Sequence, residues 1–261
     1  MHDNRRQPAY GNPITQQLGF WAAVVAALTF VSYTVCFVAI VAASPIFTWT
    51  SLADYLAYDS AFGGPFKPAA QISMIVFALS FLVLLHAIQD AVPTERKVLT
   101  RIGASFGALF ALAVGIHYFV QLTAVRVSVR EGLTSGLEHI VQANPYSTLS
   151  AINMLGWSVF LGLSCLFIAP VFPGQDIERI IRWALRANGL FCLGGGLGYV
   201  LEIEWLVFLA ITLGMGGAVL TAAVSLAVWF RWGRERADDG FRPDGAGPAG
   251  ASDEQETSPS W

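Results

Sequence analysis

The sequence predicts an all-α membrane protein, a six-transmembrane-helix bundle with short interfacial helices in the outer loops. Hydrophobic residues make up 55% of the chain and charged residues only 13%, whereas a soluble domain carries about 25% charged residues. Six separate apolar stretches are each long enough to cross a bilayer, which takes about 20 residues because a helix rises roughly 1.5 Å per residue. A mean hydropathy of +0.57 agrees with this fold class.

Composition divides the chain into three parts. Residues 1–17 form a polar N-terminal segment, residues 18–232 the transmembrane domain, and residues 233–261 a tail that is expected to be disordered because it lacks apolar periodicity. The first apolar stretch is too long for the core of a signal peptide, about 7–15 residues, so it is predicted to be a transmembrane helix. The six spans are predicted, in order, at 18–43, 70–90, 102–125, 148–171, 184–201 and 205–230.

Two loops between spans are predicted to hold short interfacial helices. In the segment 135–144, Ser135 and Glu138 have the spacing of a capping box, and apolar residues recur on one face until Asn-Pro ends the pattern. The loop after the first span repeats this arrangement, with Ser51 as the cap and Gly63-Gly64-Pro65 as the stop. Such helices either shield the ends of the spans or cover a cavity.

The positive charges predict an orientation. Most of the 15 lysines and arginines lie on one side of the six spans, and the other side holds Lys67, Arg126 and Arg130. Positively charged loops are retained in the cytoplasm, so the N-terminus and the C-terminus are both predicted to be cytoplasmic. The expected location is the cell (inner) membrane of a prokaryotic-type cell.

Two surface features predict partners. Arg179, Arg182 and Arg186 recur along one face where the fifth span begins, which suits the head groups of anionic lipids on the cytoplasmic side, although such residues also serve simply to anchor the topology. Small residues recur four apart in the third, fifth and sixth spans, as in the pairs Gly103 with Gly107 and Gly194 with Gly198. They allow close helix contacts, within the bundle, in a homo-oligomer or with another membrane protein.

Polar side chains inside the spans are the candidate functional residues, because each costs free energy in lipid unless it has a partner. Helix direction places a group of them in the outer half of the bundle, where they could line a ligand-binding pocket: His117, Tyr118, Gln121, Asn153 and Trp157. A second, inner polar layer would hold His86, Gln89 and Asn188. The alternative for both layers is that these side chains hydrogen-bond between helices and only hold the bundle together.

Several chemistries find no support in the sequence. The basic residues form no stripe for nucleic acid, and the HExxH and GxSxG signatures are absent. His86 and His117 differ too much in predicted depth to hold a haem between them, and the three cysteines show no CxxC spacing. No metal and no cofactor is therefore expected.

The runs His117–Leu122 and Gln142–Pro145 resemble segments of prokaryotic multi-pass membrane proteins that have no assigned function. This resemblance covers the middle third of the chain and implies only a small helical bundle. Three functions are compatible with the sequence. The protein could be a small-solute transporter, channel or sensor, a membrane-embedded enzyme that uses His117 as acid or base, or an assembly subunit without a ligand.

Overall fold

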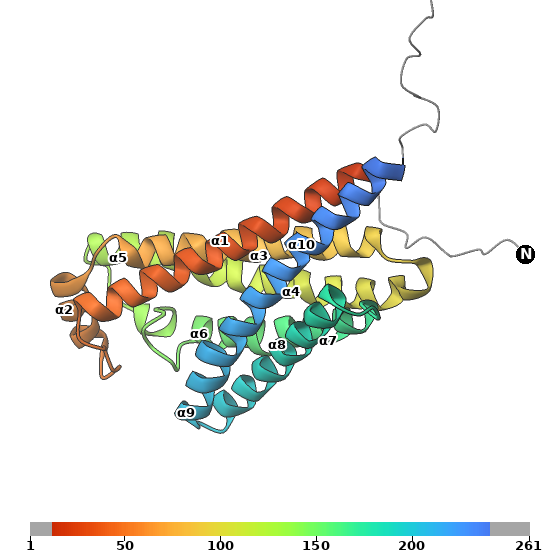
Figure 1. Ribbon diagram of the computed structural model, residues 1–261. Helices are drawn as coiled ribbons and strands as arrows, with labels where there is room; N and C mark the ends of the chain where they lie inside the picture. Colours follow the sequence, from red (N-terminus) through yellow and green to blue (C-terminus); the bar gives the residue numbers. More distant parts are fainter. Residues whose placement is uncertain (1–11, 241–261) are drawn as a thin grey trace, which may run out of the picture.

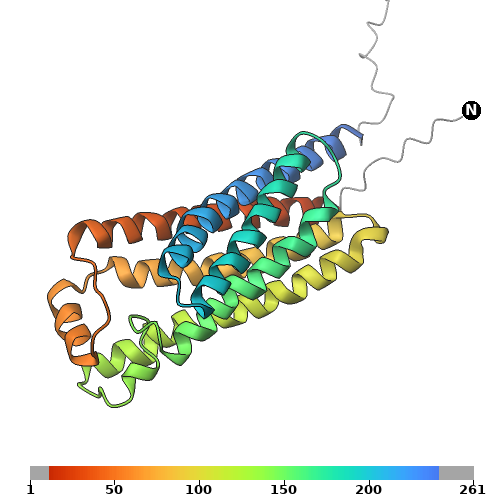
Figure 2. The same ribbon diagram turned by 90° about the horizontal axis from the view of Figure 1, so that it is seen from below.

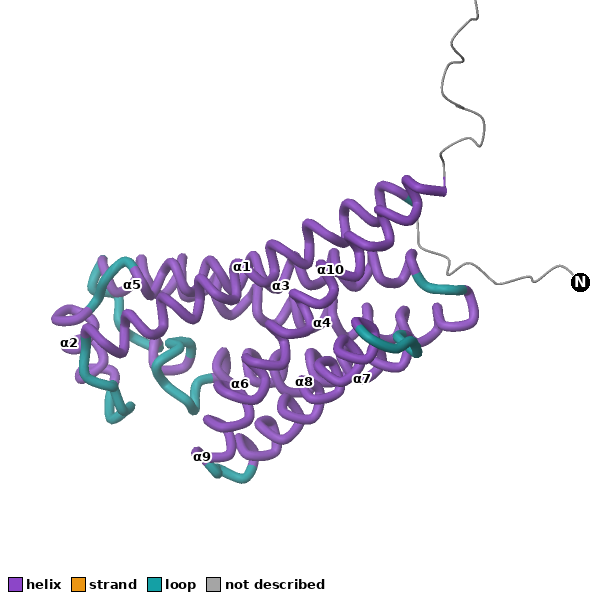
Figure 3. Tube along the Cα trace, viewed as in Figure 1, coloured by secondary structure: helices purple, strands orange, loops and turns teal. Residues whose placement is uncertain are grey.

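The structure, a computed structural model, describes residues 12–240, with side chains as far as Gly233. The described residues form helices, turns and loops but no strand (Figure 3). From residue 241 onward, the predicted disordered tail lies outside the described residues. The first part of that tail, residues 233–240, is helical instead, because the last helix continues to Gly240.

Five helical segments are long and apolar enough to cross a membrane: Pro13–Ala43, Phe66–Ala91, Thr94–Arg130, Thr148–Val171 and Glu204–Gly233. The predicted fifth span lies in α8 (Ile177–Val200), which does not meet this criterion. The helix is long enough, but Arg186, Asn188 and its glycines lower the hydropathy of its membrane-length part. A multi-pass membrane protein is thus supported by five spans rather than by the six that were predicted.

Local signals in the sequence set the first three helix boundaries. Asn12 caps α1 (Pro13–Ala43), accepting a hydrogen bond from the Thr15 N–H at 2.9 Å, and Pro13 occupies the first position, where a missing N–H costs nothing. Ser51 caps α2 (Leu52–Phe62) in the same way, and Gly63 ends it. The next helix, α3 (Phe66–Ala91), stops before Pro93, because the residue that precedes a proline avoids helical geometry.

Three long helices are continuous but change their geometry along their length. The first consists of η1 (Thr94–Arg96), α4 (Lys97–Val120), η2 (Gln121–Val125) and α5 (Arg126–Arg130). The second consists of α6 (Thr148–Leu155), η4 (Gly156–Phe160), α7 (Leu161–Ile168) and η5 (Ala169–Val171), and the third of α9 (Glu204–Val207), η6 (Phe208–Met215) and α10 (Gly216–Gly240). The segments η2, η4 and η6 are π-helical, so each long helix contains one widened turn.

The long helices form a closed ring. α1 packs on α3, α3 on α4, α4 on α7, α7 on α8, α8 on α10, and α10 returns to α1 (Figures 1 and 2). The start of α1 and the end of α10 lie at the same end of the bundle, and α2 lies at the opposite end, which we call the α2 end (Figure 1). The largest buried hydrophobic cluster fills the interior of this ring, with Phe77, Phe110 and Leu161 among its fully buried members.

The prediction of an interfacial helix at 135–144 is wrong. This segment contains only one 3-10 turn, Leu137–His139, which begins after Gly136 in a left-handed conformation with φ of 81° and ends where Ile140 leaves helical geometry with φ of −130°. Leu137 and Val141 are nevertheless buried, and they pack with Tyr55 and Val125 in a small second cluster at the α2 end. The apolar pattern at 135–144 therefore reports burial of a loop rather than a helix.

Candidate functional site

A cavity of about 240 Å³ lies within the ring, and we call it the central cavity. Its walls come from α1, α3, α4, α6, η4 and η6, together with Gln142 from the loop before α6. The cavity reaches the molecular surface beside Thr34 and Thr212, which are exposed. It is therefore an open site between helices and not a packing defect sealed in the core.

Two of the three π-helical segments, η4 and η6, line this cavity. Trp157 belongs to η4, Thr212 and Met215 belong to η6, and Tyr118 lies in the turn directly before η2. A π-helical turn interrupts the regular hydrogen-bonding ladder, and such turns occur frequently at functional sites. Two of them at one cavity point to a site shaped for something other than close packing.

The chemistry of the central cavity is neutral, aromatic and hydrogen-bonding. Among the described residues, none with a charged side chain lines it. Tyr118 interacts with the side chains of Asn153 and Trp157, and the Oδ1 atom of Asn153 is buried without a hydrogen-bond partner among the described residues. Met74, Met154 and Met215 also line the cavity, and thioether side chains adapt to ligands of irregular shape.

The five residues predicted for an outer pocket separate into two groups. Tyr118, Asn153 and Trp157 line the central cavity, whereas His117 and Gln121 do not. The imidazole of His117 is fully buried, and its Nδ1 atom lies 3.0 Å from the carbonyl oxygen of Leu149. Its Nε2 atom has no partner among the described residues. His117 thus joins α4 to α6 instead of facing the cavity.

Gln121 holds a loop in place. Its Nε2 donates to the Ile140 carbonyl at 2.6 Å, and its Oε1 accepts from the Gln142 N–H at 3.0 Å. The side chain of Gln142 in turn accepts a hydrogen bond from Gln71 at 2.9 Å. This chain of glutamines fixes the loop that forms one wall of the central cavity.

The predicted inner layer is not a single site. His86 is exposed, and Gln89 is half-buried. Asn188 is fully buried and donates to the Cys165 sulfur at 3.1 Å, while its Oδ1 atom has no partner among the described residues. The structure therefore does not bring these three residues together.

The three arginines predicted to bind lipid head groups also differ. Arg179 is exposed, whereas Arg182 donates to the carbonyl oxygens of Phe172 and Gly174 at 2.5 and 3.3 Å, which secures the turn before α8. Arg186 lies over the Trp183 ring, 5.1 Å from its centroid. Only Arg179 and Arg186 keep the surface positions that a lipid phosphate would need.

The small-residue faces are used mostly within the bundle. A side chain at Gly103 would meet Ile168, one at Gly107 would meet Leu85, and one at Gly198 would meet Leu206. Space is open beside Gly194. Gly103, Gly107 and Gly198 therefore serve close packing between neighbouring helices of the same chain.

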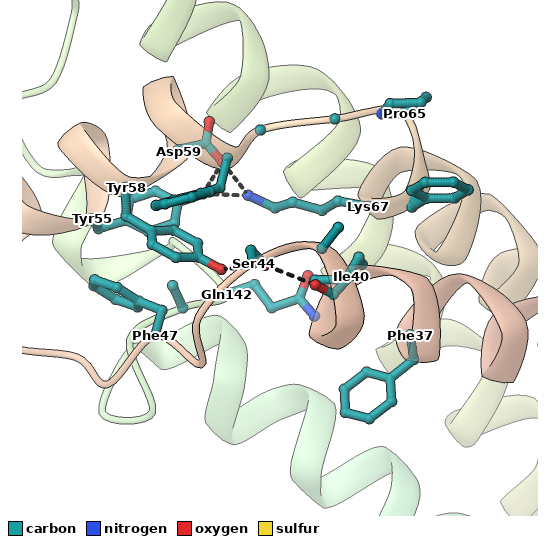
Figure 4. Close-up of a pocket in the computed structure, with 16 residues that line it drawn as sticks. Phe37, Ile40, Ser44, Phe47, Tyr55, Tyr58, Asp59, Pro65, Lys67 and Gln142 are labelled. Atoms are coloured by element: carbon teal, nitrogen blue, oxygen red, sulfur yellow. Dashed lines mark hydrogen bonds and ion pairs between the residues drawn. The ribbon is translucent and has the colours of Figure 1, made fainter.

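The α2 end holds two further hollows that the sequence pattern does not predict. The larger, about 450 Å³, lies between α2, the end of α1 and the start of α3, and we call it the α2 pocket (Figure 4). The smaller, about 360 Å³, is the side hollow, which extends towards η2 and Arg126. Both are lined by Tyr55, Asp59 and Lys67.

These three side chains form one linked group. The Lys67 ammonium lies 2.8 Å from an Asp59 carboxylate oxygen and 2.5 Å from the Tyr55 hydroxyl (Figure 4). Burial raises the pKa of Tyr55, so its phenol stays neutral and accepts a hydrogen bond from Lys67. A usable sequence signal existed, because Asp59 and Lys67 stand on either side of the Gly63-Gly64-Pro65 turn.

Comparisons with protein-family models, curated proteins and solved structures found no significant match. Among the described residues, no three His, Cys, Asp or Glu side chains are grouped as a metal site would require.

Proposed function

We propose that the protein is a multi-pass membrane protein that binds a small, uncharged molecule with an apolar, partly aromatic body in the central cavity, as a transporter, channel or sensor. The observation that carries this proposal is the uncharged lining of the central cavity among the described residues, which includes Asn153, an amide whose Oδ1 has no hydrogen-bond partner among those residues. An unpaired buried acceptor costs about 1–3 kcal/mol, so a ligand that donates one hydrogen bond there gains affinity.

The lining also sets the polarity of the ligand. A charged ligand would lose its hydration and find no counter-charge, because the cavity is lined only by uncharged side chains. Tyr33, Tyr118 and Trp157 offer ring faces and edges to an apolar body. In the orientation predicted from the positive charges, the α2 end faces outward and the central cavity opens between helices at Thr34 and Thr212.

The enzyme alternative draws less support. A catalytic acid or base must reach the substrate within hydrogen-bonding distance. His117 is fully buried, bonds to the Leu149 carbonyl and does not line the central cavity, the α2 pocket or the side hollow. Its contacts suit a structural role in joining α4 to α6.

Indole is a suitable probe because it combines an apolar ring with a single N–H donor. We expect indole to raise the thermal unfolding temperature of the purified protein and to bind about fivefold more tightly than 1-methylindole, which lacks the donor, a ratio that corresponds to about 1 kcal/mol for one neutral hydrogen bond. Indole-3-acetate, which carries a charge, should not bind in the cavity.

The variant Asn153→Ala should remove the preference for indole and leave binding of 1-methylindole unchanged. Asn188→Ala is the matched control, because Asn188 also has a buried, unpartnered Oδ1 but lies away from the central cavity. Equal binding of indole and 1-methylindole by the unmodified protein would contradict the proposal, and so would equal losses in the two variants.

A further inference from the structure

The geometry points to a second ligand site, in the α2 pocket, for a zwitterionic amphiphile: a molecule with an ammonium and an acidic group on its head and an apolar chain. We infer that its acidic group binds Lys67 and its ammonium binds Asp59. This inference concerns a different pocket and a different class of ligand from those of the central cavity, and it does not depend on the proposed function.

The α2 pocket is lined by one positive and one negative side chain. Among the described residues, Lys67 and Asp59 are the charged side chains that line the α2 pocket, so their charges sum to zero. A ligand with a single charge would pair with one of them and leave the other without a partner. A ligand that carries both charges satisfies both side chains.

Both charged side chains are partly exposed. The side chains of Lys67 and Asp59 are 38% and 29% exposed, so both charged groups remain reachable from the pocket. A pair that is only partly desolvated exchanges partners at small cost, because exposed ion pairs contribute only about 0–1 kcal/mol. Both side chains can therefore exchange their mutual contact for contacts with the charged groups of a ligand.

The rings around the pair suit the ammonium end of such a ligand. Phe47 lies 5.0 Å from the Tyr58 ring and 5.9 Å from the Tyr55 ring, so three aromatic rings form one group at this end of the pocket (Figure 4). The Tyr55 ring already holds a cation, since the Lys67 ammonium lies 4.9 Å from its centroid. Aromatic faces attract substituted ammonium groups through their electrostatic quadrupole.

The remaining wall of the pocket suits an apolar chain. Phe37, Ile40 and Phe66 line the side formed by α1 and α3, and Phe37 and Phe66 are 42% and 44% exposed. A chain that leaves the charged end along this wall would run beside the spanning helices, where lipid chains lie. The pocket thus matches a zwitterionic head together with the first part of one attached chain.

The test uses the whole protein in nanodiscs of phosphatidylglycerol, a lipid that is not zwitterionic and therefore does not occupy the site. Binding of three probes with the same chain length is measured by calorimetry below their micelle-forming concentrations: dodecylphosphocholine, dodecanoate and dodecyltrimethylammonium. We expect the zwitterionic probe to bind about tenfold more tightly than either singly charged probe, as one charge-assisted hydrogen bond contributes.

Two variants reverse the selectivity if the inference is correct. Asp59→Asn should favour dodecanoate over dodecyltrimethylammonium, and Lys67→Met should favour dodecyltrimethylammonium over dodecanoate, each by about tenfold. Because these are changes of preference, partial loss of stability does not mimic them. Glu131→Gln, which breaks the exposed pair with Arg130, is the matched control and should leave all three affinities unchanged.

A fourth probe, glycerophosphocholine, distinguishes a free solute from a lipid, because it has the same head group and no long chain. Binding equal to that of dodecylphosphocholine indicates a free zwitterionic solute, and much weaker binding indicates a lipid; both results support a zwitterion site. The inference is overturned if the three chain-bearing probes bind alike or if neither variant changes the preference. Asn153→Ala should leave these affinities unchanged, which separates this test from that of the central cavity.

Discussion

The middle of the bundle and the α2 end are held together by different forces. In the middle, Trp157 stacks on Phe77 with ring centroids 5.9 Å apart and meets Phe110 edge-on at 4.9 Å. At the α2 end, the buried apolar cluster is smaller, and polar links join its parts: Lys67 to Asp59, and Gln121 to the loop before α6. The α2 end thus combines a small apolar cluster with several hydrogen bonds and one ion pair, whereas the middle has a large core of packed rings.

This difference suggests how the molecule responds to its surroundings. Close packing of uncharged rings is insensitive to pH and salt, whereas polar links weaken when a charge is lost or screened. The central cavity therefore has fixed walls on its deeper side, and the α2 pocket has a wall, α2, that changed conditions can loosen. We expect the largest losses of stability in the middle and the most local effects at α2.

The largest effect is expected for Trp157→Ala. The ring is 5% exposed and contacts two other buried rings, so its removal leaves a cavity in the ring of helices. We expect a loss of about 3 kcal/mol in the free energy of unfolding, at the low end for such changes because lipid supplies no hydrophobic drive between helices. Denaturant titration in mixed micelles measures it.

Trp183→Ala is the matched control, because Trp183 is 59% exposed on the outer surface of α8. It should change the unfolding free energy by less than about 0.5 kcal/mol. If the two tryptophan variants lost similar amounts, the middle of the bundle would not be held by ring packing, and the contrast with the α2 end would fail.

Much of the fold could be predicted from the sequence, because a bilayer imposes a minimum length and apolarity on each spanning helix. The fifth predicted span shows the limit of that reasoning. In α8, Asn188 and Arg186 interrupt the apolar run, and contacts such as Asn188 with Cys165 make those polar groups tolerable. Such contacts between distant residues are invisible to a hydropathy pattern.

The candidate site was predictable only in part. Helical spacing put Asn153 and Trp157 on one face, and both line the central cavity. Spacing alone also suggested that His117 and Gln121 share the pocket, whereas they turn towards Leu149 and the loop at 140–142. Depth can be counted along a helix, but the direction of a side chain depends on its rotation and on its neighbours. The ion pair at Lys67 depends on how α2 folds back, which no single helix predicts.

An intermediate effect is expected for Gln121→Leu, which removes the polar link between η2 and the loop. The Ile140 carbonyl and the Gln142 N–H would lose their partners, at about 1–3 kcal/mol for groups that remain buried. Hydrogen exchange at residues 140–142 should accelerate while α3 and α4 stay protected. Thr123→Val is the control, since the exposed Thr123 hydroxyl bonds only to its own helix, and protection of the loop in both variants would show that packing holds it.

The smallest effect is expected at the start of α2, where pH acts on a single exposed carboxylate. Hydrogen bonds from the Ser51 and Thr50 hydroxyls lower the pKa of Asp54 below its ordinary value of 3.8. The lowered pKa means that the ionised Asp54 carboxylate stabilises the folded start of α2. This stabilisation is fully present at a pH above the ordinary pKa of 3.8. It disappears as the pH falls through the lowered pKa of the folded protein.

Amide exchange in α2 should therefore be constant from neutral pH down to about 4, after correction for the intrinsic rate, and should rise only below it. Thr50→Val removes one of the two donors without touching the Ser51 cap, so the rise should begin at a higher pH in that variant. Asp54→Asn should abolish the pH dependence altogether. If α2 instead loosened near neutral pH, a group other than Asp54 would control it, and the polar link through Lys67 and Asp59 would be the next to examine by the same exchange series.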